Sequence, residues 1–316
     1  MIEVRYLKIH YGDLVAVDQV SFSVSPGSIF GLIGPNGAGK TSVLRAIASL
    51  LEPTYGDILV NGKSVLHQPE KARCLLGYMP DFPPVYEDLK VWEFCDLFAH
   101  AYGLRGDLRK NKVLQCLHET GLNEKMDATC KTLSRGMRQR TLLAKTLVHE
   151  PSVLLLDEPA ANLDPKSRID LRHILKRLAS KGKSILLSSH ILSEIEDTCE
   201  TIGFMKQGKM ALAGTLEEIS KEKSKGICLK IHLSQPEHLL RTVIDSIPTL
   251  SNFEETGSDH KKYRIFLQGD ENDAAEILAQ LIQARIPVCG FISEKPRVED
   301  LFLELEARVN MESEVG

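Results

Sequence analysis

The chain has 316 residues, of which 43% are hydrophobic and 26% charged, enough for two globular domains with substantial cores. The formal net charge of −4 gives no support to nucleic-acid binding, and no apolar run approaches the roughly 18 residues that a membrane-spanning helix needs. The seven cysteines are scattered without a C-x-x-C pair, which argues against a disulfide framework and a zinc site and favours a reducing, cytosolic compartment.

Strands are predicted over residues 2–9 and 14–24. An apolar run at 28–33 then indicates a buried strand, and residues 42–51 have helical apolar spacing. Between them lies a glycine-rich loop of the form G-x-x-x-x-G-K-T, made of Gly34, Pro35, Asn36, Gly37, Ala38, Gly39, Lys40 and Thr41. Glycines let backbone N–H groups surround phosphate oxygens, while the lysine supplies a positive charge and the threonine hydroxyl a ligand for Mg²⁺. A chance glycine turn would not have this strand and helix around it, so the loop predicts nucleotide binding.

The middle of the chain alternates apolar strands with helical segments. The predicted strands are 57–60, 75–79, 153–156 and 184–188, and the predicted helices are 91–102, 109–120, 135–149 and 166–180. Asn61-Gly62 predicts a hairpin turn after the first of these strands. Continuous apolar strands separated by helices indicate a parallel sheet covered on both faces.

Residues 221–226 are charged or small and predict a linker. Beyond it, the predicted order is β-α-β-β-α-β, which suggests a small ferredoxin-like domain. The segments are strand 227–233, helix 236–247, strands near 249–257 and 262–267, helix 272–285 and strand 287–293. A helix over 297–307 would close the chain.

Three further groups are candidates for chemistry. Asp157 and Glu158 follow an apolar strand, so their side chains point to opposite sides, one toward Mg²⁺ and the other toward the attacking water as general base. His190 ends the next strand and could contact the γ-phosphate, although a lone histidine there is usually a packing residue. Ser134 with Gly136 could present helix-end amides to an anion, or be an ordinary helix cap.

The motif order GPNGAGKT, LSRGMRQR, LLLDEP, NLD and SSH resembles the ATP-binding cassette (ABC) family over roughly residues 1–220. In that family two cassettes enclose two ATP molecules, and the signature helix of one subunit reaches the γ-phosphate held by the other. The resemblance implies an ATPase that binds ATP and Mg²⁺, pairs with a second copy or a related cassette, and lies at the cytoplasmic face of a membrane as a peripheral subunit.

The same resemblance assigns roles to single residues. Tyr11 would stack on adenine with Val17 beside it, and Ser42 would join the phosphate loop. Glu158 would be the base and His190 the γ-phosphate switch. Ser134 and Gly136 would act in trans, with Asp164 at the dimer interface.

Two positions depart from the family pattern. Asp81 stands where a glutamine usually contacts Mg²⁺, and Arg135 and Met137 replace the first Gly and the Gln of LSGGQ. Arg135 could add a charge-assisted contact to phosphate or lie at the rim of the site. Both departures resemble the ABC-2-type exporter subgroup, which works with a separate membrane permease. The loop Phe82–Tyr86 is the best docking candidate, with a proline turn holding buried aromatics as the equal alternative.

The expected architecture is therefore α/β: a P-loop NTPase cassette over 1–220 and a small α+β accessory domain over 227–316. The cassette would combine a mainly parallel core sheet, an antiparallel β subdomain and a helical signature subdomain at about 85–150. A soluble cassette ATPase of DNA repair or translation is the alternative, but the segment between phosphate loop and signature has no sustained heptads and the chain has one phosphate loop. A small-molecule kinase would leave the signature and His190 unexplained.

Overall fold

The computed structural model describes residues 1–81, 84–223, 227–236, 239–245, 247–256 and 259–294. The chain divides into two compact units, Met1–Thr215 and Leu216–Gly316, each described here by itself. The helix predicted at 297–307 lies outside the described residues. Within the described part, no helix is both long and apolar enough to cross a membrane.

The centre of the first unit is a six-stranded sheet in the order β10-β9-β3-β8-β7-β6. Its strands are β3 (Ile29–Ile33), β6 (Leu76–Met79), β7 (Val153–Leu156), β8 (Ser184–Ser189), β9 (Thr201–Lys206) and β10 (Lys209–Thr215). All neighbours pair in parallel except β9 and β10, which form a hairpin. Every residue of β3, β7 and β8 is buried, as expected for strands covered on both faces.

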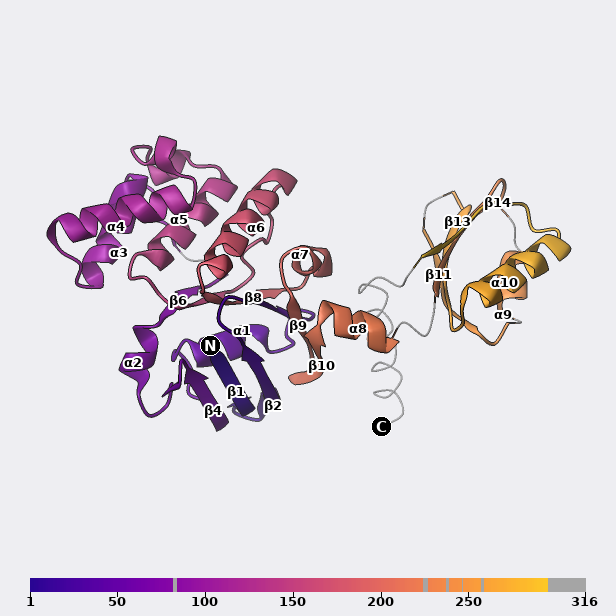
Figure 1. The fold of residues 1–316 in the computed structure, drawn as a ribbon, viewed down its shortest axis with the longest axis horizontal. Helices are drawn as coiled ribbons and strands as arrows, with labels where there is room; N and C mark the ends of the chain where they lie inside the picture. Colours follow the sequence, from indigo (N-terminus) through magenta and orange to yellow (C-terminus); the bar gives the residue numbers. More distant parts are fainter. Residues whose placement is uncertain (82–83, 224–226, 237–238, 246, 257–258, 295–316) are drawn as a thin grey trace. The chain divides into compact units, whose positions relative to one another are not determined.

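A four-stranded antiparallel sheet in the order β2-β1-β4-β5 forms a second layer. Its strands are β1 (Ile2–Tyr11), β2 (Leu14–Val24), β4 (Tyr55–Val60) and β5 (Lys63–Ser64). Helix α1 (Lys40–Ile47) packs between this sheet and the central one, and their shared core includes Val20, Leu44 and Leu155. Helix α6 (Pro165–Ser180) covers the opposite face of the central sheet (Figure 1).

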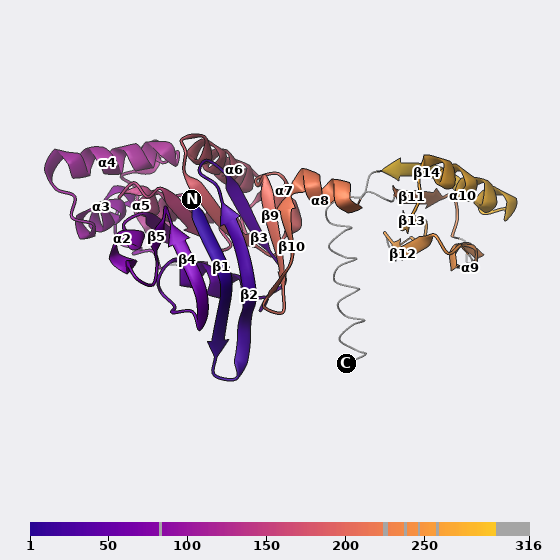
Figure 2. The ribbon, with the colours of Figure 1, turned by 60° about the horizontal axis from the view of Figure 1, so that its bottom comes forward.

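Three other helices of the first unit form a separate layer, which lies above β6 in Figure 1 and on one side of the unit in Figure 2. They are α3 (Val91–Ala101), α4 (Gly106–Glu119) and α5 (Arg135–Leu147), with α2 (Pro69–Arg73) and α7 (Leu192–Glu196) as short helices elsewhere. Three-residue 3₁₀ turns at Asn123–Lys125 and Cys130–Thr132 lead from α4 into α5. The predicted cassette, with parallel core, antiparallel layer and helical layer, is confirmed.

The second unit is an antiparallel sheet with two helices. After α8 (Leu216–Lys223), the elements are β11 (Ile227–Leu233), α9 (Leu239–Asp245), β12 (Leu250–Glu255), β13 (Lys262–Leu267), α10 (Glu271–Gln283) and β14 (Val288–Glu294). The sheet order is β12-β13-β11-β14, with every pair antiparallel. The first and third strands of the β-α-β-β-α-β unit are therefore central, and the ferredoxin-like prediction is confirmed.

The linker predicted at 221–226 is wrong for residues 221–223, which belong to α8, while 224–226 lie outside the described residues. Glutamate and lysine, which suggested a linker, are also strong helix formers. Ile219 supplies the buried contact that such a helix needs. The hairpin β9–β10 was not predicted; its turn, Gln207-Gly208, has both residues at positive φ, as a tight hairpin turn requires.

Candidate nucleotide site

The glycine-rich loop joins β3 to α1 at the carboxyl end of the central sheet, where α/β proteins bind ligands. Gly39 precedes α1 with φ of 100°, a backbone conformation that disfavours side chains. A Cβ atom at Gly39 would lie 2.4 Å from the carbonyl oxygen of Ala16, so only glycine fits there. The N-terminal amides of α1 consequently open onto the loop, where an anion can approach them.

Lys40 is held inside this loop and is 6% exposed. Its Nζ donates to the carbonyl oxygens of Gly34 at 2.6 Å and Pro35 at 3.1 Å. Burial lowers the pKa of Lys40, and the carboxylates of Glu158 and Asp157 oppose that shift. Glu158 Oε1 lies 3.8 Å from Nζ. The ammonium group therefore sits in the loop against carbonyl oxygens that phosphate oxygens can replace.

Asp157 is 1% exposed and receives two hydroxyl donors on one oxygen. Thr41 Oγ1 donates to Asp157 Oδ1 at 3.2 Å, and Ser188 Oγ donates to the same atom at 2.6 Å. The register of the parallel strands, with Leu156 opposite Leu187, brings these groups together. The donors are all oxygens, which is the set that Mg²⁺ prefers. Among the described residues no cluster of three or more His, Cys, Asp or Glu could hold a metal ion.

Ser188 also accepts a hydrogen bond from the backbone N–H of Glu158 at 2.9 Å. The Ser188 hydroxyl thus holds both the side chain of Asp157 and the backbone of Glu158. Ser188 had no predicted role, although its place at the end of an apolar strand, immediately before Ser189-His190, is a signal in the sequence.

Glu158 and His190 face each other across 32 residues of sequence. His190 Nδ1 lies 2.9 Å from Glu158 Oε2, and the Glu158 side chain is 12% exposed. Glu158 has a φ of 47°, in the left-handed region that costs a non-glycine residue about 1 kcal/mol or more. Such strain persists where the surroundings fix the backbone, here through Ser188, and it commonly marks functional sites. The two groups predicted to act on the γ-phosphate and water therefore lie together.

The residues expected around adenine lie beside Gly39 and Ser42, at the start of α1. Tyr11 is 44% exposed, and its hydroxyl is 3.3 Å from Ser42 Oγ on α1. Val17 is fully buried, with Cγ2 3.2 Å from the Cβ position of Gly39. The Tyr11 ring is thus accessible beside the phosphate loop, whereas the Val17 side chain is buried against Gly39.

The signature residues surround the N-termini of α5 and α6. Ser134 caps α5 by accepting from the N–H of Met137 at 3.3 Å, and Asp164 caps α6 by accepting from the N–H and hydroxyl of Ser167 at 3.0 and 2.6 Å. Ser134, Arg135 and Asp164 are exposed. Gly136 is buried against Ser167: a Cβ there would lie 2.2 Å from the serine Oγ.

A cavity of about 570 Å³ is lined by Asp81, Arg135 and Glu158, among other residues. Burial raises the pKa of Asp81, the carboxylates of Asp157 and Glu158 raise it further, and His190 and Arg135 act in the opposite direction. Asp81 therefore lies within electrostatic reach of the two carboxylates at the end of β7. Phe82, the first residue of the expected docking segment, lies outside the described residues.

Comparisons with known proteins agree on one family. The profile described as "ABC transporter" matches residues 17–161. The chain is 35% identical to the Nod factor export ATP-binding protein I of Cupriavidus metallidurans, over 69% of this chain and 72% of that protein. It is 35% identical to the probable multidrug ABC transporter ATP-binding protein YbhF of Escherichia coli over 71% of this chain, and it spans only 39% of that relative. A solved structure described as an ATP-binding subunit of an ABC transporter is 32% identical, with a TM-score of 0.63, over 70% of this chain and 92% of the solved one.

Proposed function

This chain belongs to the ABC transporter ATP-binding family, and we propose that it is the ATP-hydrolysing subunit of a membrane exporter that works through a separate membrane-spanning subunit. The observation that carries the proposal is the pairing of His190 with Glu158 beside Lys40 and the Asp157–Thr41 pair. These groups come from three separate segments, and together they supply each function that phosphoryl transfer to water requires: phosphate binding, metal binding and a base.

ATP would be held by the residues of the glycine-rich loop and Ser42, with Tyr11 stacked on the adenine. Thr41 and Asp157 would hold Mg²⁺, and Asp81 would supply a further oxygen near it. The metal supplies charge neutralisation for the phosphate oxygens when it is bound. Lys40 would exchange its contacts with the carbonyls of Gly34 and Pro35 for contacts with phosphate oxygens.

In the hydrolytic step, Glu158 accepts a proton from the attacking water while the new O–Pγ bond forms and the bond from Pγ to the bridging oxygen breaks. The products are ADP and inorganic phosphate. His190, hydrogen-bonded through Nδ1 to Glu158, holds that carboxylate in place, and its other ring nitrogen would contact the γ-phosphate. Lys40 stabilises the charge that develops on the phosphoryl group.

A second cassette would complete the site. Ser134, Arg135 and Asp164 are exposed at the ends of α5 and α6, so they are available to another subunit. The Ser134 oxygen accepts from Met137 and keeps its own proton to donate to phosphate. Gly136 lets α5 approach α6 closely enough to hold the signature turn. ATP would therefore act as the ligand that closes a dimer.

The membrane subunit would contact the loop after β6. Tyr86 is 52% exposed and packs edge-to-face on Phe94 of α3, with ring centroids 5.9 Å apart. An anchored, accessible aromatic side chain is a typical centre of a protein interface. The chain would then lie at the cytoplasmic face of the membrane as a peripheral subunit. Co-purification of a membrane protein with the wild-type chain, and its loss with Tyr86→Ala, would support this assignment. A chain that hydrolyses ATP but never associates with membranes would instead be a soluble ABC ATPase.

Complementation tests the shared site directly. Lys40→Ala and Ser134→Ala should each be nearly inactive in ATP hydrolysis. If Ser134 acts in trans, a 1:1 mixture should recover about a quarter of wild-type activity, because half of the dimers formed by random exchange hold one intact site of two. If the mixture stays as inactive as its components while both variants still dimerise, Ser134 does not act on the partner's ATP.

A further inference from the structure

The turn that carries His190 is held by the side chain of the residue before it. Ser189 ends β8, and its Oγ accepts a hydrogen bond from the N–H of Ile191 at 3.0 Å, so the bond spans His190. The same hydroxyl has two acceptors within reach, the carbonyl oxygen of Ile191 at 3.2 Å and Glu194 Oε2 at 3.0 Å. A hydroxyl has one proton to donate. The group that accepts it therefore decides how the Ser189 side chain, and the turn, are oriented.

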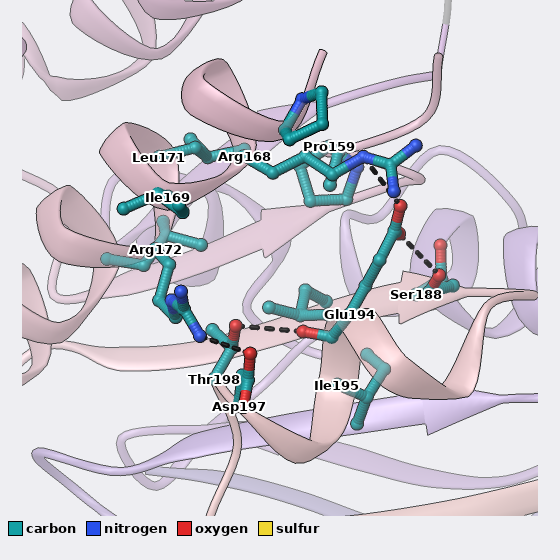
Figure 3. Close-up of a pocket in the computed structure, with 15 residues that line it drawn as sticks. Pro159, Arg168, Ile169, Leu171, Arg172, Ser188, Glu194, Ile195, Asp197 and Thr198 are labelled. Atoms are coloured by element: carbon teal, nitrogen blue, oxygen red, sulfur yellow. Dashed lines mark hydrogen bonds and ion pairs between the residues drawn. The ribbon is translucent and has the colours of Figure 1, made fainter. Parts of the chain in front are cut away.

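Glu194 is the stronger of the two acceptors because a carboxylate hydrogen bond is charge-assisted. It lies on α7, and its side chain is 8% exposed. Its other oxygen, Oε1, lies 3.3 Å from Arg168 Nε on α6, and Figure 3 shows the Glu194 side chain extending from α7 toward that guanidinium group. One oxygen of the Glu194 carboxylate is thus hydrogen-bonded to Ser189, and the other pairs with the arginine by charge, without a hydrogen bond.

Arg168 connects this carboxylate to the start of α6. Its backbone N–H donates to the carbonyl oxygen of Asp164 at 3.0 Å, in the first turn of that helix. Asp164 in turn caps α6 through Ser167. A continuous set of contacts thus runs from the exposed N-terminus of α6 through Arg168, Glu194 and Ser189 to the turn at His190.

Packing between α6 and α7 is incomplete, which makes the polar contacts important. A cavity of about 310 Å³ lies between these helices and the end of β8, lined by apolar side chains such as Ile169, Leu187 and Ile195. Empty volume forfeits dispersion contacts. Two ion pairs join the helices across it, Arg168–Glu194 and Arg172–Asp197. Only the first of them also bonds to the turn that carries His190.

We propose that Glu194 is a positioning residue for His190: by accepting the Ser189 hydroxyl and pairing with Arg168, it sets the orientation of the turn from which His190 reaches Glu158. The inference rests on the proposed ATP hydrolysis, because it assigns Glu194 an effect on that step. The same contacts connect the N-terminus of α6, the end available to a second subunit, to the turn that carries His190.

The competing explanation is that Glu194 only holds α7 against α6. Arg172 and Asp197 provide the matched control, since they join the same two helices and Asp197 lies three residues from Glu194. Asp197→Ala removes this second pair without touching Ser189. The two variants, Glu194→Ala and Asp197→Ala, are therefore compared in the full-length chain, with circular dichroism and thermal melting to verify folding. Ser189→Ala is the substitute probe if Glu194→Ala fails to fold.

Turnover gives the first readout. Glu194→Ala should lower kcat for Mg-ATP hydrolysis by about tenfold to a hundredfold, the usual effect of a small misplacement of a reacting group, with KM for ATP within about twofold. Asp197→Ala should change kcat by less than about twofold. Combined with His190→Ala, Glu194→Ala should cause no additional loss. Equal losses from Glu194→Ala and Asp197→Ala, or a full additional loss in the His190→Ala background, would overturn the proposal.

The second readout needs no nucleotide. The ¹⁵N shifts of the His190 ring report which nitrogen accepts a hydrogen bond, and they should change in Glu194→Ala but not in Asp197→Ala. If the wild-type chain hydrolyses no ATP, the proposed function fails while this measurement still tests the positioning. If wild-type hydrolysis is normal and neither kcat nor the ring shifts respond to Glu194→Ala, the positioning role fails alone.

Discussion

Replacing Glu158 by glutamine tests the central chemical assignment. Glutamine keeps the size of the side chain and an oxygen for hydrogen bonding, but it cannot accept a proton at neutral pH. Positioned general bases contribute about 10² to 10⁴ in rate, so kcat should fall by that factor, equivalent to about 3 to 5 kcal/mol in the activation barrier. The left-handed backbone at Glu158 is retained, since glutamine and glutamate share the same preferences there.

ATP affinity should not fall in the same variant. Glu158 Oε1 lies 3.8 Å from Lys40 Nζ. Two unit charges at that distance attract by about 4 kcal/mol at an effective dielectric constant of about 20. This energy is the most that the Glu158–Lys40 attraction can take away from the binding of phosphate to Lys40. Glu158 also repels the phosphate charge. Its neutralisation should therefore leave the Kd for ATP unchanged or lower it, by up to about tenfold after Lys40 readjusts to its carbonyl partners.

Phosphate release at saturating Mg-ATP measures the first effect, and calorimetric titration with Mg-ATP at low temperature measures the second. Glu158→Asp is the control: it keeps a carboxylate but shortens its reach to His190, so part of the turnover should survive. Size-exclusion chromatography of Glu158→Gln with Mg-ATP should show a stable dimer. Turnover of Glu158→Gln within about tenfold of wild type would remove Glu158 from the role of base. A Kd that rises more than about tenfold would refute the electrostatic reasoning.

Three further changes test the surroundings of the site. Tyr11→Ala should weaken ATP binding by about 1 to 3 kcal/mol if the ring stacks on the base, whereas Tyr11→Phe should not; equal titration curves for all three proteins would contradict stacking. Gly136→Ala should lower the free energy of unfolding in urea by about 1 kcal/mol, because overpacking against Ser167 outweighs the helix preference of alanine. Burial lowers the pKa of His149, whose Nε2–H donates to the carbonyl oxygen of Leu76. The folded state therefore binds a proton less readily than the unfolded state, so the free energy of unfolding should fall as the pH drops through the ordinary histidine range. His149→Gln should reduce that fall, measured by urea titrations at pH 7 and pH 5.

The phosphate loop illustrates what consecutive residues can encode. Its glycines, lysine and threonine act within one strand–loop–helix segment, and the close approach of Gly39 to Ala16 explains why glycine is needed there. The helix boundary at Ser134 was equally local, because its side chain caps its own helix. Predictions of this kind rest on sterics and hydrogen bonds within a few residues.

The errors and omissions have a different origin. The charged stretch at 221–223 had the composition of a linker, but tertiary burial of Ile219 favours a helix. The position of Ser188 at a strand end was a local signal, but its partner Asp157 lies 31 residues away and only the structure identifies it. Glu194 pairs with Arg168, 26 residues away, and nothing local distinguishes this glutamate from many others in the chain.

The sequence alone thus determined the family, the alternation of strands and helices, and the residues proposed for phosphate, metal and proton chemistry. Only the tertiary structure decided how these residues meet: the parallel pairing of β7 with β8 brings Ser188 to Asp157, and the turn after β8 brings His190 to Glu158. The physical reason is that residue type sets what a side chain can do, whereas sheet order and register set which side chains share a site.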